Sequence, residues 1–382
     1  MINRTLEDEI KNKFYKGKII ILIGPRQSGK TTLINKILKN IDKKVLSLDG
    51  EEFNVKEQLK NPSSEKLKLI TGDNEIVFID EAQKIKDIGS VLKLFHDKLN
   101  NVQVIATGSS SFELLNKTGE PLTGRKYEFT LYPFSFSELL NNSDFITENS
   151  KLESRLIYGS YPEIVTNPSE SEELLKLLSK SYLFKDLFSL DNINNPEGFE
   201  TIVRALALQI GSEVSYKEIA NTVGMNKLTV DKYIKLLERA FIVFKLPAYS
   251  KNIRNEIRKG KKYYFYDNGI RNAVIGNFNL LENRNDIGAL WENYLVSERM
   301  KYLVYKRKDY RKFFWRTTQQ QEIDYIEEIS GEIFCYEFKW SKKAKAKFSK
   351  TFTEKYLPKQ NKLITKENYY EFLMDYNGTH LN

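Results

Sequence analysis

The sequence has few of the residues that build thiolate, imidazole or disulfide sites. It contains one cysteine, Cys335, and two histidines, His96 and His380. A single cysteine excludes a disulfide framework within the chain and leads us to expect a reducing, cytoplasmic location. Two histidines give no basis for a Cys/His zinc cluster or for a histidine-based catalytic triad. Any chemistry must therefore depend on other residue types.

Long apolar runs are also absent. No stretch approaches the roughly 20 apolar residues of a membrane-spanning helix, and the N-terminal sequence MINRTLEDEIKNKFYKGK has no apolar signal core. We therefore expect no membrane partner. The length of 382 residues is typical of two to three domains. The net charge of +9 permits an anionic partner such as nucleic acid, but a generally lysine-rich composition would explain it equally well.

The chain is organised around the stretch from Ile19 to Leu33, IIILIGPRQSGKTTL. Its five leading apolar residues predict a buried strand, and the apolar spacing after the loop predicts a helix. Between them lies the pattern G-x-x-x-x-G-K-[ST], which in this context indicates a P-loop. Such a loop surrounds phosphate with backbone N–H groups, while its lysine reaches the β- and γ-phosphates and its hydroxyl ligates Mg²⁺. ATP and Mg²⁺ are therefore the predicted cofactors.

The predicted nucleotide-binding residues of this loop are Gly24, Pro25, Arg26, Gln27, Ser28, Gly29, Lys30, Thr31 and Thr32. Lys30 is in addition a predicted catalytic residue, and Thr31 a predicted magnesium ligand. The alternative is an ordinary strand, turn and helix that happens to contain a lysine.

A second acidic motif, EIVFIDEAQ, follows about 50 residues later. We expect Asp80, at the carboxyl end of a parallel strand, to hold Mg²⁺ directly or through water. Glu81 is then placed to orient and activate the attacking water. A third apolar strand, VQVIA, precedes Ser109, which we expect beside the γ-phosphate, where it would sense the bound nucleotide. The serine-rich stretch could also cap a helix.

Arg125 follows the sequence Leu-Thr-Gly and is the candidate for an arginine that stabilises transition-state charge on the transferred phosphoryl group. It could act in cis, or on a neighbouring copy, which would require a homo-oligomer. The alternative is a structural surface arginine. Alternating strands and helices, with both phosphate motifs at strand carboxyl ends, predict a doubly wound parallel sheet.

These motifs carry a resemblance. The runs GPRQSGKTTL, FIDEAQ, ATGSS and LTGRKYEFTLYPFSFSE, in this order, resemble a family of bacterial and archaeal AAA-type ATPases. In that family the ATPase core is followed by a further domain of unknown function. The resemblance covers about residues 15 to 340. Arg26 and Gln27 fit the family's P-loop, Gln83 fits its second motif, and the stretch YGSYPE at 158–163 resembles its Gly-Tyr-Pro element.

The middle of the chain predicts a helix-turn-helix. Two helical stretches, 216–223 and 227–241, are joined by a short turn that contains glycine. Strands at 242–248 and 262–266 would form a wing, with a basic stretch between them. The second helix could lie in a DNA major groove and the wing on phosphates. Alternatively, the winged helix serves only for packing within the chain. On the second helix we expect Leu228, Tyr233, Leu236 and Leu237 to be buried.

The C-terminal part predicts a hairpin whose strands, 322–326 and 333–340, are joined through Ser330-Gly331. A turn centred there places Asp324 opposite Glu337, with Cβ atoms about 5 Å apart. Two opposed carboxylates are unfavourable unless a cation, such as a shared divalent metal, lies between them. Lys339, two residues beyond Glu337, points to the same face of the strand.

This pattern of Asp followed by Glu-x-Lys on neighbouring strands resembles the core of PD-(D/E)xK nucleases. The resemblance implies that Asp324 and Glu337 bind Mg²⁺ or Mn²⁺ and that Lys339 is catalytic, because it positions the nucleophilic water or stabilises developing charge. Glu292, on the preceding apolar helix, would be a further metal ligand. The alternative is a half-exposed sheet face with ordinary charge pairs.

The predicted fold class is α/β: an AAA+-like P-loop NTPase core with a parallel sheet, a helical lid, a winged helix and a restriction-endonuclease-like domain. The expected boundaries are 1–145, 146–211, 212–268 and 269–382. Two functions fit these motifs. The first is an ATP-hydrolysing enzyme that binds DNA, with or without metal-dependent cleavage by the C-terminal domain. The second is an ATP-driven regulatory switch that acts on protein partners through an inert nuclease-like domain.

Overall fold

The computed structural model describes residues 2–109, 122–180, 193, 195–250, 260–345 and 347–374. The chain divides into two compact units. Unit 1 comprises Met1–Phe134 with Arg239–Phe241, and unit 2 comprises Ser135–Glu238 with Ile242–Asn382. Within the described ranges, no helix combines the length and the apolar character needed to cross a bilayer. The finer division into four domains stays a prediction.

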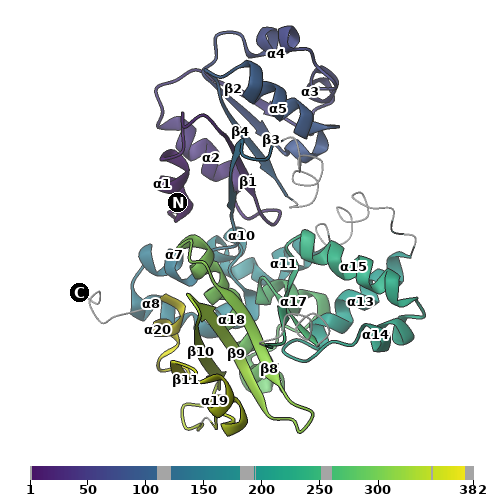
Figure 1. Cartoon of the computed structure of the whole chain (residues 1–382), viewed down its shortest axis with the longest axis vertical. Coiled ribbons are helices and arrows are strands. Elements are labelled where there is room, and N and C mark those ends of the chain that lie inside the picture. The colour runs from purple at the N-terminus through teal and green to yellow at the C-terminus, as the bar shows by residue number, and fades with distance from the viewer. Residues whose placement is uncertain are drawn as a thin grey trace. The chain divides into compact units, whose positions relative to one another are not determined.

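Unit 1 is built on a five-stranded sheet with the order β2-β3-β4-β1-β5, in which every pairing is parallel (Figure 1). Its strands are β1 (Ile19–Ile23), β2 (Val45–Asp49), β3 (Ile76–Asp80), β4 (Gln103–Gly108) and β5 (Lys126–Thr130). Its helices are α1 (Leu6–Lys11), α2 (Lys30–Lys39), α3 (Phe53–Gln58), α4 (Ser64–Thr71) and α5 (Ile88–Lys98), with a 3-10 turn η1 at Ala82–Lys84. All five residues of β1 are buried, as its apolar run predicts. The parallel sheet of the predicted core is confirmed.

The place of β4 between β1 and β3 decides which residues meet at one edge of this sheet. Parallel strands end at a common edge. The P-loop follows β1, Ser109 follows β4, and Asp80 is the last residue of β3. These three strand ends are therefore neighbours in the order in which the strands pair.

Unit 2 begins with short helices and continues with longer ones. They are α7 (Phe136–Asn141), α8 (Phe145–Ser150), α9 (Leu152–Tyr158), α10 (Pro162–Thr166), α11 (Ser171–Ser179), α13 (Pro196–Leu208), α17 (Asn268–Ile275) and α18 (Ile287–Tyr305), with 3-10 turns η2 (Pro168–Glu170) and η4 (Leu281–Asn283). Helix α13 starts at a proline, which suits the first helical position because the N–H there needs no partner within the helix.

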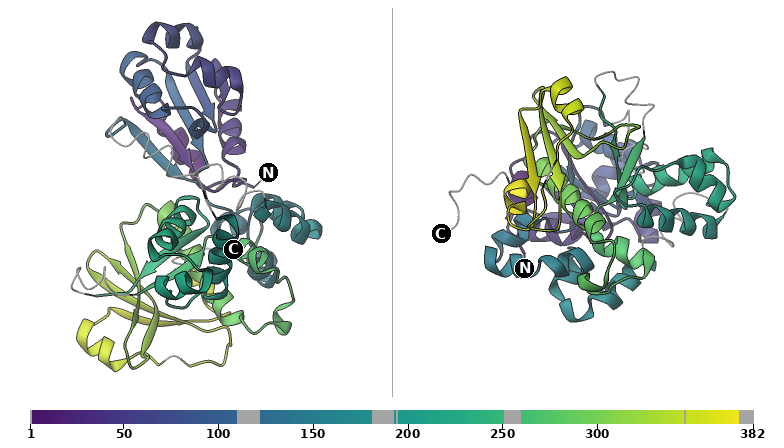
Figure 2. Two further views of the ribbon diagram at one scale, coloured as in Figure 1. Left: turned by 90° about the vertical axis from the view of Figure 1, so that its right-hand side faces the viewer. Right: turned by 90° about the horizontal axis from the view of Figure 1, so that it is seen from below.

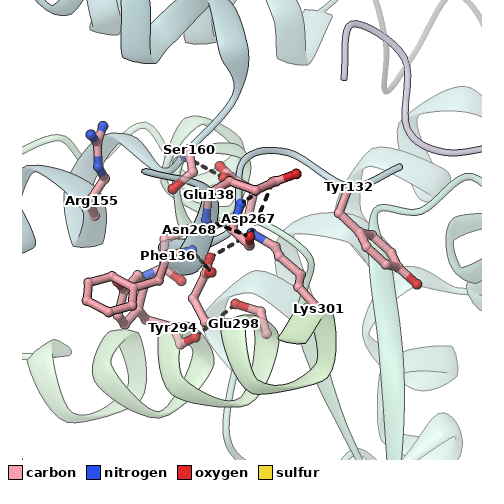
Figure 3. Close-up of polar contacts among 12 residues, drawn as sticks. Tyr132, Phe136, Glu138, Arg155, Ser160, Asp267, Asn268, Tyr294, Glu298 and Lys301 are labelled. Atoms are coloured by element: carbon pink, nitrogen blue, oxygen red, sulfur yellow. Dashed lines mark hydrogen bonds and ion pairs between the residues drawn. The ribbon is translucent and has the colours of Figure 1, made fainter. Parts of the chain in front are cut away.

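A buried polar network joins the start of α7 to α18 (Figure 3). The backbone N–H of Phe136 donates to Glu298 Oε2 at 2.7 Å, and Lys301 Nζ donates to Glu298 Oε1 at 2.6 Å. Asp267 caps α17 and also accepts a hydrogen bond from Ser160 N at 2.7 Å. Burial raises the pKa of both Asp267 and Glu298. Because buried polar groups are costly unless paired, these bonds specify one arrangement of the network.

Helices α14 (Tyr216–Val223) and α15 (Lys227–Arg239) are followed by an antiparallel pair, β6 (Val243–Pro247) and β7 (Lys261–Phe265). These elements occur in the order expected for a winged helix, and Gly224 ends α14 in the left-handed conformation. The basic residues expected between the strands, Lys251, Arg254, Arg258 and Lys259, lie outside the described part. Lys261, the last of that group, starts β7.

The prediction that Leu228 is buried is wrong, because its exposed fraction is 80%. The buried face of α15 is formed by Val230, Tyr233, Ile234 and Leu237, which recur every three or four residues. Leu228 lies two positions before Val230, so it points away from that face.

The C-terminal part of unit 2 contains a four-stranded sheet with the order β11-β10-β9-β8 (Figures 1 and 2). The strands are β8 (Arg311–Arg316), β9 (Glu322–Ile329), β10 (Glu332–Phe338) and β11 (Gln360–Ile364), and helices α19 (Lys350–Tyr356) and α20 (Tyr369–Met374) flank β11 in sequence. β8, β9 and β10 are antiparallel, and β11 is parallel to β10. From α18 onward the order is therefore α-β-β-β-α-β, followed by α20.

The predicted hairpin register is confirmed. Tyr336 pairs with Tyr325, and both turn residues, Ser330 and Gly331, have positive φ values of 52° and 81°. Asp324 and Glu337 are the next position along this ladder, just beyond its last pair.

The lone cysteine lies in the core of this sheet. Cys335 is fully buried among apolar side chains of β8, β9, β10 and α19 that include Phe313, Ile326 and Phe352. Burial raises the pKa of its thiol to about 12, so the thiol stays protonated at neutral pH.

Candidate functional site

The P-loop of unit 1 is folded around Lys30. This lysine is only 5% exposed, and its Nζ donates to the carbonyl oxygens of Gly24 at 3.1 Å and Pro25 at 2.9 Å. Burial lowers the pKa of Lys30 to about 8. Gly24 has a φ of 152°, and a Cβ there would collide with the carbonyl of Leu131, so the loop needs glycine at this position.

The other predicted loop residues also lie between β1 and the first turn of α2. Pro25, Arg26, Gln27 and Ser28 connect β1 to Gly29, which caps α2 in the left-handed conformation, and Thr32 lies in the first turn of α2. Arg4 Nη1 donates to the carbonyl of Ser28 at 3.3 Å, which fixes the loop from the N-terminal segment. Sequence reasoning missed Arg4, because nothing local to it indicates a contact 24 residues away.

Thr31 and Asp80 meet as predicted for a shared magnesium site. Thr31 Oγ1 donates to Asp80 Oδ2 at 2.8 Å, and Thr107 Oγ1 donates to Asp80 Oδ1. These are oxygen ligands of the kind that Mg²⁺ prefers, and the hydroxyl and carboxylate already lie side by side. The residues present therefore fit a magnesium ion. Thr107 was not among the predicted site residues, although a polar residue near the end of the apolar strand VQVIA was a usable signal.

Glu81, Gln83 and Ser109 form a second cluster beside Asp80. Gln83 Nε2 donates to Glu81 Oε2 and, at 2.9 Å, to Ser109 Oγ. Glu81 has a positive φ of 45°, and this turn brings the side chain of Gln83 back over the strand ends. Gln83 is 3% exposed, and its Oε1 atom accepts no hydrogen bond from any described residue. The predicted water-activating acid, Glu81, and the predicted sensing serine, Ser109, therefore both accept hydrogen bonds from the side-chain amide of Gln83.

Arg125 does not join this site. It lies directly before β5, and its carbonyl accepts a hydrogen bond from Ile19 N at the amino end of β1. Its Nε bonds Asp97 Oδ1 at 3.0 Å. The whole of β1 separates it from the P-loop, a span of about 17 Å for five residues. This corrects the alternative in which Arg125 acts in cis; a role on the nucleotide of a neighbouring copy stays a prediction.

In unit 2, Asp324, Glu337 and Lys339 are brought together. Lys339 Nζ lies 3.5 Å from Asp324 Oδ2 and 3.4 Å from Glu337 Oε2. Asp324 Oδ2 also accepts a hydrogen bond from Phe338 N at 2.8 Å. Burial and the facing Asp324 carboxylate raise the pKa of Glu337 to about 8.

Glu292 is close to these acids but has partners of its own. Its Oε1 atom accepts hydrogen bonds from Lys262 Nζ at 3.1 Å and Tyr264 Oη at 2.5 Å. Lys262 Nζ also lies 2.6 Å from Glu322 Oε1 and is 1% exposed. Although burial opposes its charge, Glu292 and Glu322 raise the pKa of Lys262, which therefore stays protonated.

This arrangement corrects the predicted three-acid metal cluster of Asp324, Glu337 and Glu292. Across the described ranges, no group of three or more acidic, histidine or cysteine side chains is arranged to hold a metal ion. The physical reason is that Lys262 already neutralises Glu292. Sequence reasoning missed Lys262, although a lysine inside the strand KKYYF was a signal for a buried ion pair.

Three family models match successive parts of the chain. Residues 16–140 match a family described as an AAA domain. Among solved structures, the chain is similar to the Walker-type ATPase of Pyrococcus abyssi, with a TM-score of 0.50 and 17% identity; the match covers 72% of this chain and 96% of that one. Unit 1 has the fold of an AAA-type P-loop ATPase.

The remaining residues match families without an assigned function. Residues 149–281 and 287–377 match two families, each described as a domain of unknown function (DUF8612 and DUF4143). The chain is similar to an uncharacterised protein of Mycobacterium tuberculosis, with 27% identity over 88% of this chain and 73% of that protein. An uncharacterised protein of Haemophilus influenzae is 28% identical over 65% of this chain and 64% of its own length.

Proposed function

We propose that unit 1 binds and hydrolyses ATP with Mg²⁺. The observation that carries this proposal is the direct contact between Thr31 Oγ1 and Asp80 Oδ2 at 2.8 Å, with Lys30 in the adjoining loop. Lys30 exchanges its bonds to the Gly24 and Pro25 carbonyls for the charged β- and γ-phosphate oxygens of ATP, which are stronger partners for a buried ammonium. Thr31 and Asp80 would hold Mg²⁺, which neutralises charge on those oxygens.

Glu81 supplies the base. Its carboxylate takes a proton from a water molecule while the water oxygen bonds to the γ-phosphorus. The bond from that phosphorus to the bridging oxygen breaks, and ADP leaves with phosphate. Asp80 holds the start of this turn in place, because its Oδ1 atom accepts a hydrogen bond from Glu81 N at 3.2 Å.

Phosphate release with and without Mg²⁺ tests this proposal. We expect the wild type to release phosphate only when Mg²⁺ is present. Glu81→Gln should keep affinity for a fluorescent ATP analogue and lose turnover by at least about 100-fold. Equal turnover in the wild type and Glu81→Gln would contradict the proposal.

A second candidate function is DNA binding and metal-dependent cleavage by unit 2. It is favoured by the contact of Lys339 with both Asp324 and Glu337, and by Glu337 Oε1, which is buried and receives no hydrogen bond from a described residue. A divalent ion shared by the two acids would supply that partner. Exposed lysines on α15, such as Lys227 and Lys235, suit contact with phosphates.

An assay with single- and double-stranded DNA and Mn²⁺ or Mg²⁺ tests the second candidate. Cleavage by the wild type and by Lys359→Ala, a surface control, but not by Asp324→Ala, would support it. Binding should weaken as salt rises if phosphates are contacted. ATP hydrolysis without cleavage of any DNA would instead favour the regulatory switch. The ion pair of Glu292 with Lys262 supports that alternative, because it occupies one of the predicted metal ligands.

A further inference from the structure

Gln83 holds a position from which it can act on the reacting water. Its side-chain nitrogen faces Glu81 and Ser109, as it must, because a carboxylate can only accept hydrogen bonds. Its oxygen, Oε1, is therefore the atom left over. That atom is buried and accepts no hydrogen bond from the described residues. Leaving a buried amide oxygen without a hydrogen-bond donor costs free energy. The site therefore lacks one hydrogen-bond donor for Gln83 Oε1.

A water molecule can supply the missing donor. Water has two O–H groups, and hydrolysis requires one of them to point at the base, Glu81. The second O–H needs an acceptor so that the lone pair of the water oxygen faces the γ-phosphorus. Gln83 is the neighbouring residue whose amide both fixes the carboxylate of Glu81 and offers a free acceptor beside it.

We propose that Gln83 orients the attacking water together with Glu81. Its Nε2 holds the base in place and its Oε1 accepts the second O–H of the water. In the reaction the water oxygen bonds to the γ-phosphorus while the bond from that phosphorus to the bridging oxygen breaks and ADP takes up the electron pair. One proton of the water passes to Glu81, and the other stays on the product phosphate and keeps its bond to Gln83 until release. The proposal rests on the proposed ATP hydrolysis in unit 1 and adds a residue to it.

Ser109 extends this assignment. The Nε2 atom of Gln83 divides its two N–H groups between Glu81 and Ser109 Oγ, the latter at 2.9 Å. The Ser109 hydroxyl can donate its own hydrogen to a γ-phosphate while its oxygen still accepts from Gln83. The position of the water would then depend on whether a γ-phosphate is present.

Two buried glutamines of unit 1 make a matched test. Gln83→Met removes both amide atoms at similar volume. Gln103→Met is the control, because Gln103 is also 3% exposed but lies at the amino end of β4, where its oxygen accepts from Tyr15 N at 2.7 Å and its nitrogen donates to Lys18 O at 3.1 Å. Any general cost of losing a buried amide appears in both variants.

Steady-state turnover is the first measurement. We expect Gln83→Met to lower kcat by about 100-fold while KM for ATP changes less than about threefold, because the residue acts on the water and not on ATP. Gln103→Met should keep the kcat of the wild type. A kcat that falls equally in both variants, or a loss that appears only in KM, would overturn the assignment.

The second measurement needs no turnover. ADP with aluminium fluoride imitates the transition state and requires an oriented water, whereas ADP with beryllium fluoride imitates bound ATP. We expect Gln83→Met to lose at least about tenfold in affinity for the aluminium complex and to keep its affinity for the beryllium complex. Unchanged discrimination between the two complexes would overturn the role of Gln83.

The two proposals fail in different ways. A wild-type chain that binds both complexes but releases no phosphate from ATP would overturn the proposed hydrolysis. Discrimination lost in Gln83→Met would still support an oriented water, and discrimination kept would reject it.

Discussion

Asp80, the last residue of β3 in unit 1, and Asp324, within β9 in unit 2, are both strand-borne acids, but the partners that contact them directly differ in charge. Asp80 accepts hydrogen bonds from the neutral hydroxyls of Thr31 and Thr107. Asp324 lies 3.5 Å from the ammonium of Lys339, and Lys262 holds the nearby Glu292. A dication can replace hydroxyl hydrogen bonds without leaving a charge unpaired, whereas at Asp324 it must compete with a lysine. The direct partners of Asp80 thus suit the proposed metal, whereas those of Asp324 already include a cation of the chain itself.

The largest expected effect separates the two sites by activity. Lys30→Ala removes the ammonium that contacts the phosphates, so we expect phosphate release to fall at least about 100-fold. Lys339→Ala, the matched change in unit 2, should leave turnover within about twofold, because Lys339 contacts Asp324 and Glu337 of its own unit. Steady-state phosphate release checks both. A comparable loss in Lys339→Ala would show that the sites are coupled.

Stability tests the claim that unit 2 balances its own charge. Lys262→Met leaves Glu292 without its cation and Glu322 with Arg316 alone, 3.7 Å away, and breaking a buried pair in this way costs about 3 kcal/mol. Lys359→Met removes an exposed partner of Glu332 and should cost less than about 1 kcal/mol. Urea unfolding followed by tryptophan fluorescence suits this comparison, because Trp291, Trp315 and Trp340 all lie in unit 2.

The double variant Lys262→Met with Glu292→Gln is the further control. Removing the charge of Glu292 together with that of Lys262 should recover part of the lost stability. Equal stability of Lys262→Met and Lys359→Met would contradict the view that Lys262 neutralises the buried Glu292.

The pH dependence of nucleotide binding tests whether Lys30 binds phosphate in its charged form. Burial lowers the pKa of Lys30 to about 8, and phosphate binds its charged form, so affinity should be nearly constant below pH 8. Above pH 8 it should fall by up to about tenfold per pH unit, as the free loop loses its proton. Titration of a fluorescent ADP from pH 7 to about 9.5 measures this. Lys30→Arg, which stays charged, should flatten the profile.

The smallest expected effect concerns Arg125, at the opposite edge of the unit 1 sheet from Lys30. Its pair with Asp97 is about one-third exposed, so Arg125→Ala should change stability by less than about 1 kcal/mol. Turnover at low protein concentration should stay within about twofold of the wild type. If turnover of the wild type rises with protein concentration and that of Arg125→Ala does not, the arginine acts on a neighbouring copy.

Sequence reasoning succeeded where one short stretch contains the whole signal. The apolar run at Ile19–Ile23, the glycine loop and Lys30 predicted strand, loop and helix, because local pattern and burial agree there. The pairing of Tyr336 with Tyr325 followed from the turn at Ser330 and Gly331, since a tight turn fixes hairpin register.

Sequence reasoning failed where the position or the partner of a residue is decided by the fold and not by its residue type. Nothing near Glu292 indicates that Lys262, 30 residues earlier, will take its carboxylate. Arg125 was expected at the phosphates because it follows the other motifs, but the parallel pairing of β5 with β1 puts it at the amino edge. Leu228 was expected inside because of its residue type, and the spacing of the other apolar residues on α15 places it outside.

The isolation of Cys335 gives the chain a practical property. Its thiol is the sole native one, fully enclosed and held in the unreactive protonated form. Maleimide reagents, which need an accessible thiolate, will leave it untouched under native conditions. A pair of cysteines introduced on the surface, one in each unit, can therefore carry donor and acceptor dyes without any background substitution. Energy transfer between them would record directly whether ATP moves one unit against the other.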